Sequence, residues 1–239
     1  MPQFLVSKED IDKDSASAII SGDEAKHLTS SLRARVGESV LIFDGEGQRW
    51  AGVIEGISQG AVAIRTLKEL QSSEPLRQVV LVQSLIKGDR WEWLLEKATE
   101  LGVTKIVPLK AKHSVVEIAN AKVEKKISRW RKILLAASKQ CERGKIPQIT
   151  EPVGPDEFFK ALGPPTLGET RFVLAERHAD EAAYDSGRGD IILAIGPEGG
   201  WSEEELVAFT ASKFIKLSLG SRILRSETAA LAALAKLTN

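Results

Sequence analysis

The chain has 239 residues, enough for one large domain or two small ones, and its 43% hydrophobic and 28% charged residues are typical of a soluble globular protein. Its 33 basic and 33 acidic residues balance, so net charge alone neither favours nor excludes a nucleic-acid partner. No apolar run approaches the ~20 residues of a membrane span, and the N-terminus lacks the charged start and apolar core of a signal peptide. The single cysteine, Cys141, excludes an internal disulfide and gives no basis for a structural zinc site. We therefore expect a cytoplasmic protein that binds neither a membrane nor a metal ion.

The first seventy residues contain short β-like runs separated by turn residues, at 40–43, 49–54 and 61–65. Asp, Gly and Ser cluster between these runs, as expected of hairpin turns. This pattern predicts a small β-barrel or sandwich, interrupted by a helical stretch from about residue 22 to residue 33. Residues 71–75 are polar and end in a proline, which is typical of a linker. We therefore expect two domains, at residues 1–72 and 76–239.

Strands and helices alternate from Gln78 onward. Apolar runs that read as buried strands lie at residues 79–82, 105–109, 171–175, 191–195 and 214–219. This alternation predicts an α/β domain with a mostly parallel sheet covered by helices on both faces.

Capping residues and apolar spacing place the helices between these strands. Asp89 is a candidate N-cap for a helix with Trp93, Leu94, Ala98 and Leu101 on its apolar face, closed by glycine at position 102. A long helix follows, with its apolar face running from residue 123 to residue 141. Residues 202–205 form a capping box, and residues 227–237 are the last helix.

Two glycine-bearing segments each follow a predicted strand and precede a predicted helix, at residues 195–200 and 219–228. Glycine permits the positive φ and close backbone approach that a ligand-holding loop needs, and ligands bind at the carboxyl ends of strands in open α/β sheets. Neither segment is a dinucleotide fingerprint or a phosphate loop with Gly-Lys-Ser/Thr, which disfavours dehydrogenases and nucleotide triphosphatases. A tight strand–helix turn is the structural alternative for the first loop. Surface salt bridging is the alternative for Arg222 and Arg225 in the second.

In combination these segments resemble the SPOUT superfamily of S-adenosylmethionine-dependent RNA methyltransferases, and within it the bacterial 16S ribosomal RNA (uridine-N3)-methyltransferase family of the RsmE type. The resemblance covers nearly the whole chain. The motifs that carry it lie at residues 1–6, 27–28, 32–33, 43–45, 87–89, 97–103, 140–143, 195–200 and 219–228. Gln3 departs from the family pattern, which has a basic residue at this position.

The resemblance implies a homodimer with an N-terminal PUA-like β-barrel and a C-terminal domain tied in a deep trefoil knot from about residue 171 onward. It also implies that S-adenosylmethionine lies against the knot loops, with adenine in an apolar slot of main chain. The residues that would hold this cofactor are Leu174, Glu176, Ile195, Gly196, Gly200, Leu217, Leu219, Gly220, Ile223 and Leu224.

The same resemblance suggests roles in the chemistry. The N3 proton of uridine is weakly acidic and must be lost before N3 attacks a methyl group. Arg225 is the candidate for orienting the base and stabilising negative charge on its carbonyl oxygens, and Glu198 is the weaker candidate for accepting the proton. Glu227 reads as a helix-capping residue, and Cys141 as a buried free cysteine and not a nucleophile.

Basic residues supply candidate contacts to small-subunit ribosomal RNA, either naked or in an assembled subunit. The candidates are Arg33, Arg35, Lys139, Arg143 and Arg222. For the basic stretch between residues 105 and 145, a solvated helix face is the simpler interpretation. Two alternatives to the uridine methyltransferase stay open: an RNA-binding dimer of the same fold without turnover, and an enzyme that methylates another RNA base.

Overall fold

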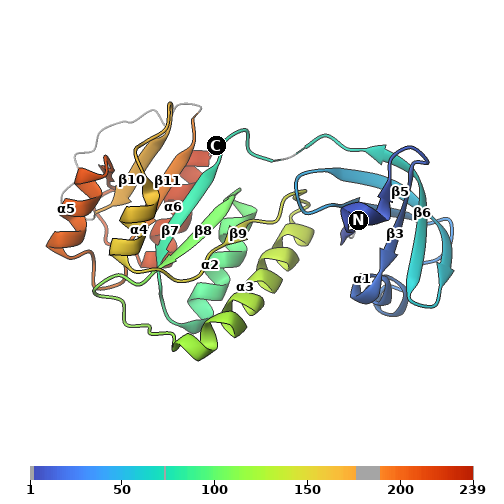
Figure 1. The fold of residues 1–239 in the computed structure, drawn as a ribbon, viewed down its shortest axis with the longest axis horizontal. Helices are drawn as coiled ribbons and strands as arrows, with labels where there is room; N and C mark the ends of the chain where they lie inside the picture. Colours follow the sequence, from blue (N-terminus) through green and yellow to red (C-terminus); the bar gives the residue numbers. More distant parts are fainter. Residues whose placement is uncertain (1–2, 73, 176–188, 239) are drawn as a thin grey trace. The chain divides into compact units, whose positions relative to one another are not determined.

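The structure is a computed structural model that describes residues 3–72, 74–175 and 189–238. The chain divides into two compact units (Figure 1), one made of Met1–Glu74 with Leu135–Ile146 and the other of Pro75–Leu134 with Pro147–Asn239. The sequence places one boundary near residues 72–76, but residues 135–146 cluster with the N-terminal unit. The first unit therefore draws on a helix end that sequence analysis assigns to the second domain.

The first unit is built on a six-stranded sheet in the order β1-β4-β5-β6-β3-β2, in which β1 pairs parallel to β4 and the other pairs are antiparallel. Its elements are β1 (Gln3–Leu5), η1 (Lys8–Asp10), β2 (Ile11–Asp12), β3 (Ser17–Ser21), α1 (Gly22–Lys26), η2 (His27–Ser31), β4 (Ser39–Phe43), β5 (Arg49–Ser58) and β6 (Ala61–Glu69). Sequence analysis predicted β4 to β6 and the helical stretch but missed β3 and the short strands β1 and β2.

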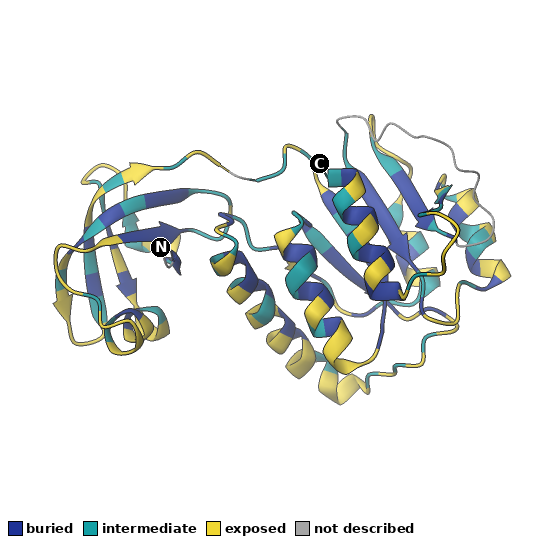
Figure 2. Ribbon diagram, turned by 180° about the vertical axis from the view of Figure 1, so that it is seen from behind, coloured by how far each residue is buried: buried dark blue, intermediate teal, exposed yellow. Residues whose placement is uncertain are grey.

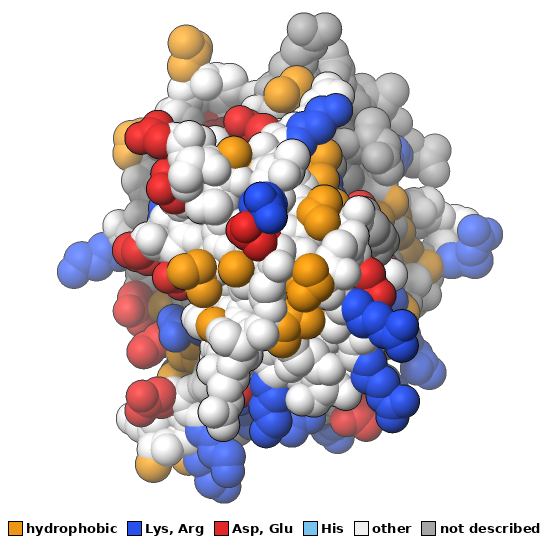
Figure 3. Space-filling view, turned by 90° about the vertical axis from the view of Figure 1, so that its right-hand side faces the viewer, with side chains coloured by type: hydrophobic (Ala, Val, Ile, Leu, Met, Phe, Trp, Pro, Cys, Tyr) orange, Lys and Arg blue, Asp and Glu red, His pale blue; other side chains and the backbone are white. Residues whose placement is uncertain are grey.

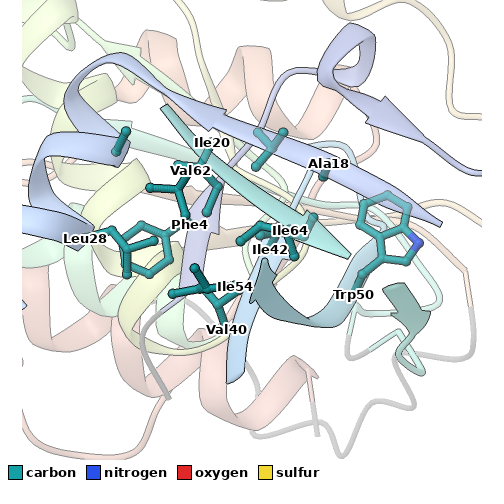
Figure 4. Close-up of a cluster of buried hydrophobic side chains, with 12 residues drawn as sticks. Phe4, Ala18, Ile20, Leu28, Val40, Ile42, Trp50, Ile54, Val62 and Ile64 are labelled. Carbon is teal, nitrogen blue, oxygen red and sulfur yellow. The ribbon is translucent and has the colours of Figure 1, made fainter. Parts of the chain in front are cut away.

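One hydrophobic core fills the concave side of this sheet (Figure 4), and Phe4, Ile20, Ile42, Val62 and Ile64 are at most 1% exposed. The β5–β6 pairing shifts register beside Gly52, where a Cβ would lie 2.5 Å from the side chain of Ile64. Only glycine fits this close approach. The register shift is a β-bulge, which bends β5 and helps the sheet to curl around its core.

The second unit contains a six-stranded sheet in the order β12-β10-β11-β7-β8-β9, with every pair parallel. Its strands are β7 (Val79–Ser84), β8 (Lys105–Leu109), β9 (Gln148–Ile149), β10 (Thr170–Leu174), β11 (Ile191–Ile195) and β12 (Ile215–Leu217). Its helices are α2 (Gly88–Glu100), α3 (Asn120–Gln140), α4 (Pro155–Leu162), α5 (Glu203–Ala211) and α6 (Ser226–Thr238). This confirms the predicted α/β class and parallel sheet, while β9 and α4 were not predicted.

Helices cover both faces of the sheet. The central strands are therefore buried, as their dark blue colour in Figure 2 shows. On one face Val82, Val173 and Ala194 pack in a single cluster with Phe158 of α4 and Phe209 of α5. The alternate strand residues point to the other face, where α6 contacts β11 and packs against α2. A parallel sheet buried in this way explains why its strands read as continuous apolar runs.

Two details of α2 correct the sequence prediction. The helix begins at Gly88, so Asp89 lies within its first turn and Lys87 is the N-cap residue. Trp93 is 46% exposed, whereas Trp91 is buried and packs against Trp130 of α3 with ring centroids 5.2 Å apart. Glycine at position 102 has φ +87° just after the helix, as predicted for a C′ residue.

The C-terminal end of α3 and the turn after it are held to the N-terminal unit by buried polar contacts. The Arg143 guanidinium lies 2.7 Å from Glu74, with side chains only 6% and 12% exposed. Gln3 donates from Nε2 to the Arg143 carbonyl at 2.7 Å and accepts from Arg49 Nε at 2.8 Å. Gln3 is 1% exposed, so the departure from the family pattern at this position serves packing and not an RNA contact.

The trefoil knot stays a prediction, because residues 176–188 after β10 lie outside the described residues. Within the parts of the chain that the structure describes, no helix combines the length and the apolar character needed to cross a membrane.

Candidate functional site

A cavity of about 500 Å³ lies where β10 and β11 end, between the two glycine loops and the start of α6. Its walls come from three segments, residues 174–175, 195–201 and 223–226, together with Leu206 of α5 and Ala229 of α6. The segments lie far apart in the sequence and meet because the carboxyl ends of parallel strands share one edge of the sheet. The position expected for a ligand site is therefore hollow.

The cavity brings together most of the predicted site residues: Leu174, Ile195, Gly196, Gly200, Ile223 and Leu224, with Glu198 and Arg225. Leu217, Leu219 and Gly220 do not belong to its lining. Leu217 is buried in β12 and its carbonyl accepts a hydrogen bond from the Ala175 amide at 3.2 Å, which ties the second loop to the cavity wall. Glu176, also predicted, lies outside the described residues.

Trp201 closes one wall and fixes the first glycine loop. Its indole Nε1 donates to the carbonyl of Leu174 at 3.0 Å, and its ring packs edge-on against Phe209 at 4.7 Å between centroids. A Cβ on Gly196 would lie 3.1 Å from this ring. A side chain at position 196 would therefore be in tight contact with the tryptophan, which favours glycine there.

Ser226 ties the same loop to α6. Its hydroxyl donates to the Gly196 carbonyl at 2.6 Å and accepts from Gln83 Nε2 at 2.9 Å. Gln83 is fully buried at the end of β7, and its Oε1 has no hydrogen-bond partner among the described residues. This chain links β7, β11 and α6 and leaves the loop backbone little freedom to move.

The turn after β11 is closed by the Gly200 amide, which donates to the Pro197 carbonyl at 2.9 Å. Gly200 has φ +71°, and its carbonyl lies 3.2 Å from Nδ1 of His113. A Cβ on Gly199 would lie 2.9 Å from the His113 side chain. Gly199 is therefore favoured by the close approach of His113, and Gly200 by its positive φ.

The predicted capping box opens α5 directly after this loop. Ser202 Oγ accepts from the Glu205 amide, and the Glu205 carboxylate accepts from the amides of Ser202 and Lys112 at 2.8 and 2.9 Å. Next to it, hydrogen bonds from its own backbone, from Ser202 and from Lys112 lower the pKa of Glu204 to about 2. The box explains how the end of the glycine loop is anchored.

The second loop, residues 218–225, is exposed and irregular. Gly220 has φ +103° and its amide donates to Ser218 Oγ at 3.3 Å. Ile223 is 67% exposed although it lines the cavity, and Arg225 is exposed just before α6. Ile223, Leu224 and Arg225 of this loop line the cavity, so it presents both apolar surface and a cation to a ligand.

The predicted RNA contacts divide into two groups. Arg33, Arg35 and Arg222 are exposed. Arg143 is buried against Glu74, and Lys139 is held by Glu24 at 2.7 Å, so neither presents the open cation that a phosphate contact requires. We therefore remove Lys139 and Arg143 from the candidate RNA contacts.

Both basic and acidic side chains are present on the one face that Figure 3 draws. Across the ranges that the structure describes, no group of three or more His, Cys, Asp or Glu side chains is arranged to hold a metal ion.

Comparisons with known proteins identify the family. Residues 72–238 match the RNA methyltransferase domain family, and residues 20–67 match the RNA methyltransferase PUA domain. The ribosomal RNA small subunit methyltransferase E of Mycobacterium bovis is 31% identical over 223 residues, which cover 92% of this chain and 85% of that relative. The chain belongs to the ribosomal RNA small subunit methyltransferase E family.

Other members of this family support the assignment. The methyltransferase E of a Synechocystis strain is 30% identical over 93% of this chain and 73% of its own length. The crystal structure of methyltransferase E from Neisseria gonorrhoeae, bound to S-adenosylmethionine, has a TM-score of 0.86 and 28% identity and covers 99% of this chain and 96% of its own. A Legionella pneumophila methyltransferase with the same cofactor bound has a TM-score of 0.85 and 32% identity over the same shares.

These matches confirm the predicted resemblance to ribosomal RNA methyltransferases and the PUA-like character of the first unit. Sequence analysis missed Trp201 and Ser226, which support the site in this family member. The signal for both was position alone: Trp201 directly follows the first segment and Ser226 lies within the second, and each carries a side chain able to donate a hydrogen bond.

Proposed function

We propose that the protein transfers a methyl group from S-adenosylmethionine to N3 of a uridine in small-subunit ribosomal RNA. The observation that carries this proposal is the single cavity that both glycine loops, Glu198 and Arg225 line together. Relatives named ribosomal RNA small subunit methyltransferase E, and the neighbouring structure of that name with S-adenosylmethionine bound, support both the cofactor and the substrate.

The residues of the cavity fit this cofactor. Its volume of about 500 Å³ is within the range of small-molecule sites, and its walls are mainly apolar side chains and glycine backbone. Glu198 contributes a carboxylate, which suits a cationic sulfonium and opposes a pyrophosphate. Gly196 and Gly200 keep the loop free of side chains where the ribose and methionine parts would lie, and Leu224 borders the adenine end.

We propose that Arg225, which lines the cavity just before α6, acts on the base. Bound S-adenosylmethionine supplies an electrophilic methyl group, and its sulfur keeps the bonding electrons when that group leaves. Loss of the N3 proton leaves negative charge on the uracil carbonyl oxygens, and a guanidinium that donates to one of these oxygens would stabilise the charge while leaving N3 open to the methyl group. Glu198, on the same cavity wall, is the group proposed to accept the proton.

Binding of RNA would involve both units. Arg33 and Arg35 are exposed on the PUA-like unit, and Arg222 is exposed three residues before Arg225. Structured RNA is bound largely through its backbone and shape, with a target base turned out of its stack. We propose that the first two arginines dock the RNA and that Arg222 contacts a phosphate near the target.

We also propose that the enzyme works as a homodimer in the cytoplasm and that its second unit is knotted. The dimer and the knot are proposed from the resemblance to the family, since the exposed Trp93 and Val207 are single apolar side chains of a kind that is normal at a protein surface. Size-exclusion chromatography with light-scattering detection tests the dimer directly. A molar mass of one chain at micromolar concentration would contradict it.

The function is tested by transfer of labelled methyl from S-adenosylmethionine to purified ribosomal subunits from cells that lack this enzyme. We expect label in small-subunit RNA and none in large-subunit RNA, with naked RNA compared in parallel. Calorimetry should show binding of S-adenosylmethionine and none of ATP. Cofactor binding without transfer would instead support an RNA-binding protein without turnover.

A further inference from the structure

Arg90, the third residue of α2, lies between two carboxylates that come from distant parts of the chain. Its Nη1 is 3.8 Å from Oε1 of Glu198, in the first glycine loop. Its Nε is 3.7 Å from Oε1 of Glu227, at the start of α6. The arginine side chain is 45% exposed, so it joins a surface carboxylate on one side to a buried one on the other.

Glu227 is the buried partner. Its side chain is only 8% exposed, and its Oε2 is buried with no hydrogen-bond partner among the described residues. A carboxylate removed from water is costly unless a counter-charge and hydrogen bonds compensate, and a helix N-terminus supplies only part of this. Within the part of the chain that the structure describes, Arg90 is the cation recorded within 4.0 Å of Glu227. The attraction between the Glu227 carboxylate and the Arg90 guanidinium therefore holds the guanidinium on the side that faces the protein interior.

Glu198 stands between two hollows. It lines the cofactor cavity and also a more open hollow of about 570 Å³ bordered by Lys87, Asp89, Arg90 and Val115. A base that approaches the cavity from this hollow meets Glu198 at the border. The orientation of this carboxylate therefore decides what the arriving base encounters.

We propose that Arg90 is a positioning residue for methyl transfer: Glu227 holds Arg90, and Arg90 holds the Glu198 carboxylate at the border of the cofactor cavity. The inference rests on the proposed role of Glu198 as proton acceptor. Arginine suits this position because two different nitrogens of one rigid group face two carboxylates, whereas lysine has a single nitrogen. Arg90 itself does not contact the reacting atoms.

The first test is a double-mutant cycle on the single-turnover rate at saturating cofactor and RNA. We expect Arg90→Ala and Glu198→Gln each to lower the rate about 10²-fold, as misplacement of a reacting group does, and the double variant to be no slower than Glu198→Gln alone. The dissociation constant of Arg90→Ala for S-adenosylmethionine should stay within about threefold of that of the unaltered enzyme. Arg90→Lys should give an intermediate rate because it restores one contact at a time. The proposal would be overturned if the two rate reductions multiplied in the double variant, or if Arg90→Ala kept a normal rate.

The second test measures the contribution of the Arg90–Glu227 pair to the melting temperature and does not depend on enzyme activity. Arg90→Ala should lower the melting temperature by about 2–4 °C, and adding Glu227→Gln should restore most of it because the buried charge is then gone. Arg129→Ala is the matched control, since this arginine of the same unit is exposed and pairs with Glu92 at 2.7 Å. No restoration by Glu227→Gln would refute the anchoring role. If the unaltered enzyme transfers no methyl, the proposed function fails while this measurement still tests the Arg90–Glu227 pair.

Discussion

Arg225 and Arg222 lie three residues apart in the same exposed loop, yet only Arg225 lines the cofactor cavity. Sequence analysis already gave them different roles, with Arg225 acting on the base and Arg222 contacting RNA. Their different positions relative to the cavity agree with this division. Arg225 should act on the chemical step and Arg222 on RNA affinity.

We expect Arg225→Ala to lower the single-turnover rate of methyl transfer about 10²–10³-fold, the usual cost of removing one preorganised charge-stabilising contact. Affinity for S-adenosylmethionine should change less than about threefold, and lysine should rescue only in part because a point charge cannot match a planar fork. Arg222→Ala is the matched control: it should weaken RNA binding and leave the rate at saturating RNA unchanged. Equal losses of cofactor affinity and rate in Arg225→Ala would assign this arginine a structural role.

Gly220 carries a second prediction at this scale. Its φ of +103° disfavours any side chain, although the space around its Cβ position is open. The strain, and not a clash with the protein, should therefore rearrange the second loop in Gly220→Val and weaken cofactor binding at least about tenfold. Gly37→Val is matched in strain, with φ +91° and equally open space in the first unit, and should leave cofactor affinity unchanged. Calorimetry on both variants, after circular dichroism shows them folded, gives the answer.

Among the elements, α5 depends on the capping box that the sequence predicted. Ser202→Ala removes an acceptor for the Glu205 amide and should cost ~1 kcal/mol in the free energy of unfolding, since N-cap serines contribute about 0.5–2 kcal/mol. Thr210→Ala in the same helix is the control, because its hydroxyl only donates to the Leu206 carbonyl on an exposed face. Denaturant unfolding should separate the two variants, and equal midpoints would show that the box contributes nothing measurable.

Elements were predictable where local chemistry decides them and not where tertiary contacts do. The strand at residues 105–109 and the capping box before α5 follow from apolar runs and cap residues, and both were found with the correct bounds. The short strands β1, β2 and β9 carry too few residues to show a period, so only their pairing partners reveal them. The exposure of Trp93 and burial of Trp91 depend on how α2 packs, which helical spacing alone did not resolve.

The candidate site was predictable to a similar extent. The glycine loops with Glu198 and Arg225 stand out in the sequence, and the cavity unites them. The contribution of Arg90 was not predictable, because α2 precedes the first loop by about a hundred residues and only the folded sheet brings them together. The burial of Arg143 was missed for the same reason, since its partner Glu74 lies in the predicted linker.

At the scale of the whole molecule, the N-terminal unit is completed by residues 135–146 of the chain. Deleting residues 1–75 would therefore remove the partners of this segment as well as the barrel. A point substitution is a cleaner test: Glu74→Ala should destabilise the first unit by about 3 kcal/mol, because the ion pair with Arg143 is buried. Lys8→Ala breaks an exposed pair with Glu46 and should shift the unfolding midpoint far less. Similar unfolding midpoints for both variants would contradict this reading of the buried pair.

The account of the whole enzyme depends most on the reaction assigned to the cavity between the two glycine loops. In the most direct measurement, small subunits from cells that lack this enzyme are incubated with the purified enzyme and S-adenosylmethionine. Their RNA is then digested to nucleosides, and the methylated product is identified by mass spectrometry against authentic standards. We predict one 3-methyluridine per small-subunit RNA with the unaltered enzyme and a strongly reduced yield at the same time point with Arg225→Ala. Methylation of another base, or cofactor binding with no methylated nucleoside, would contradict the assignment.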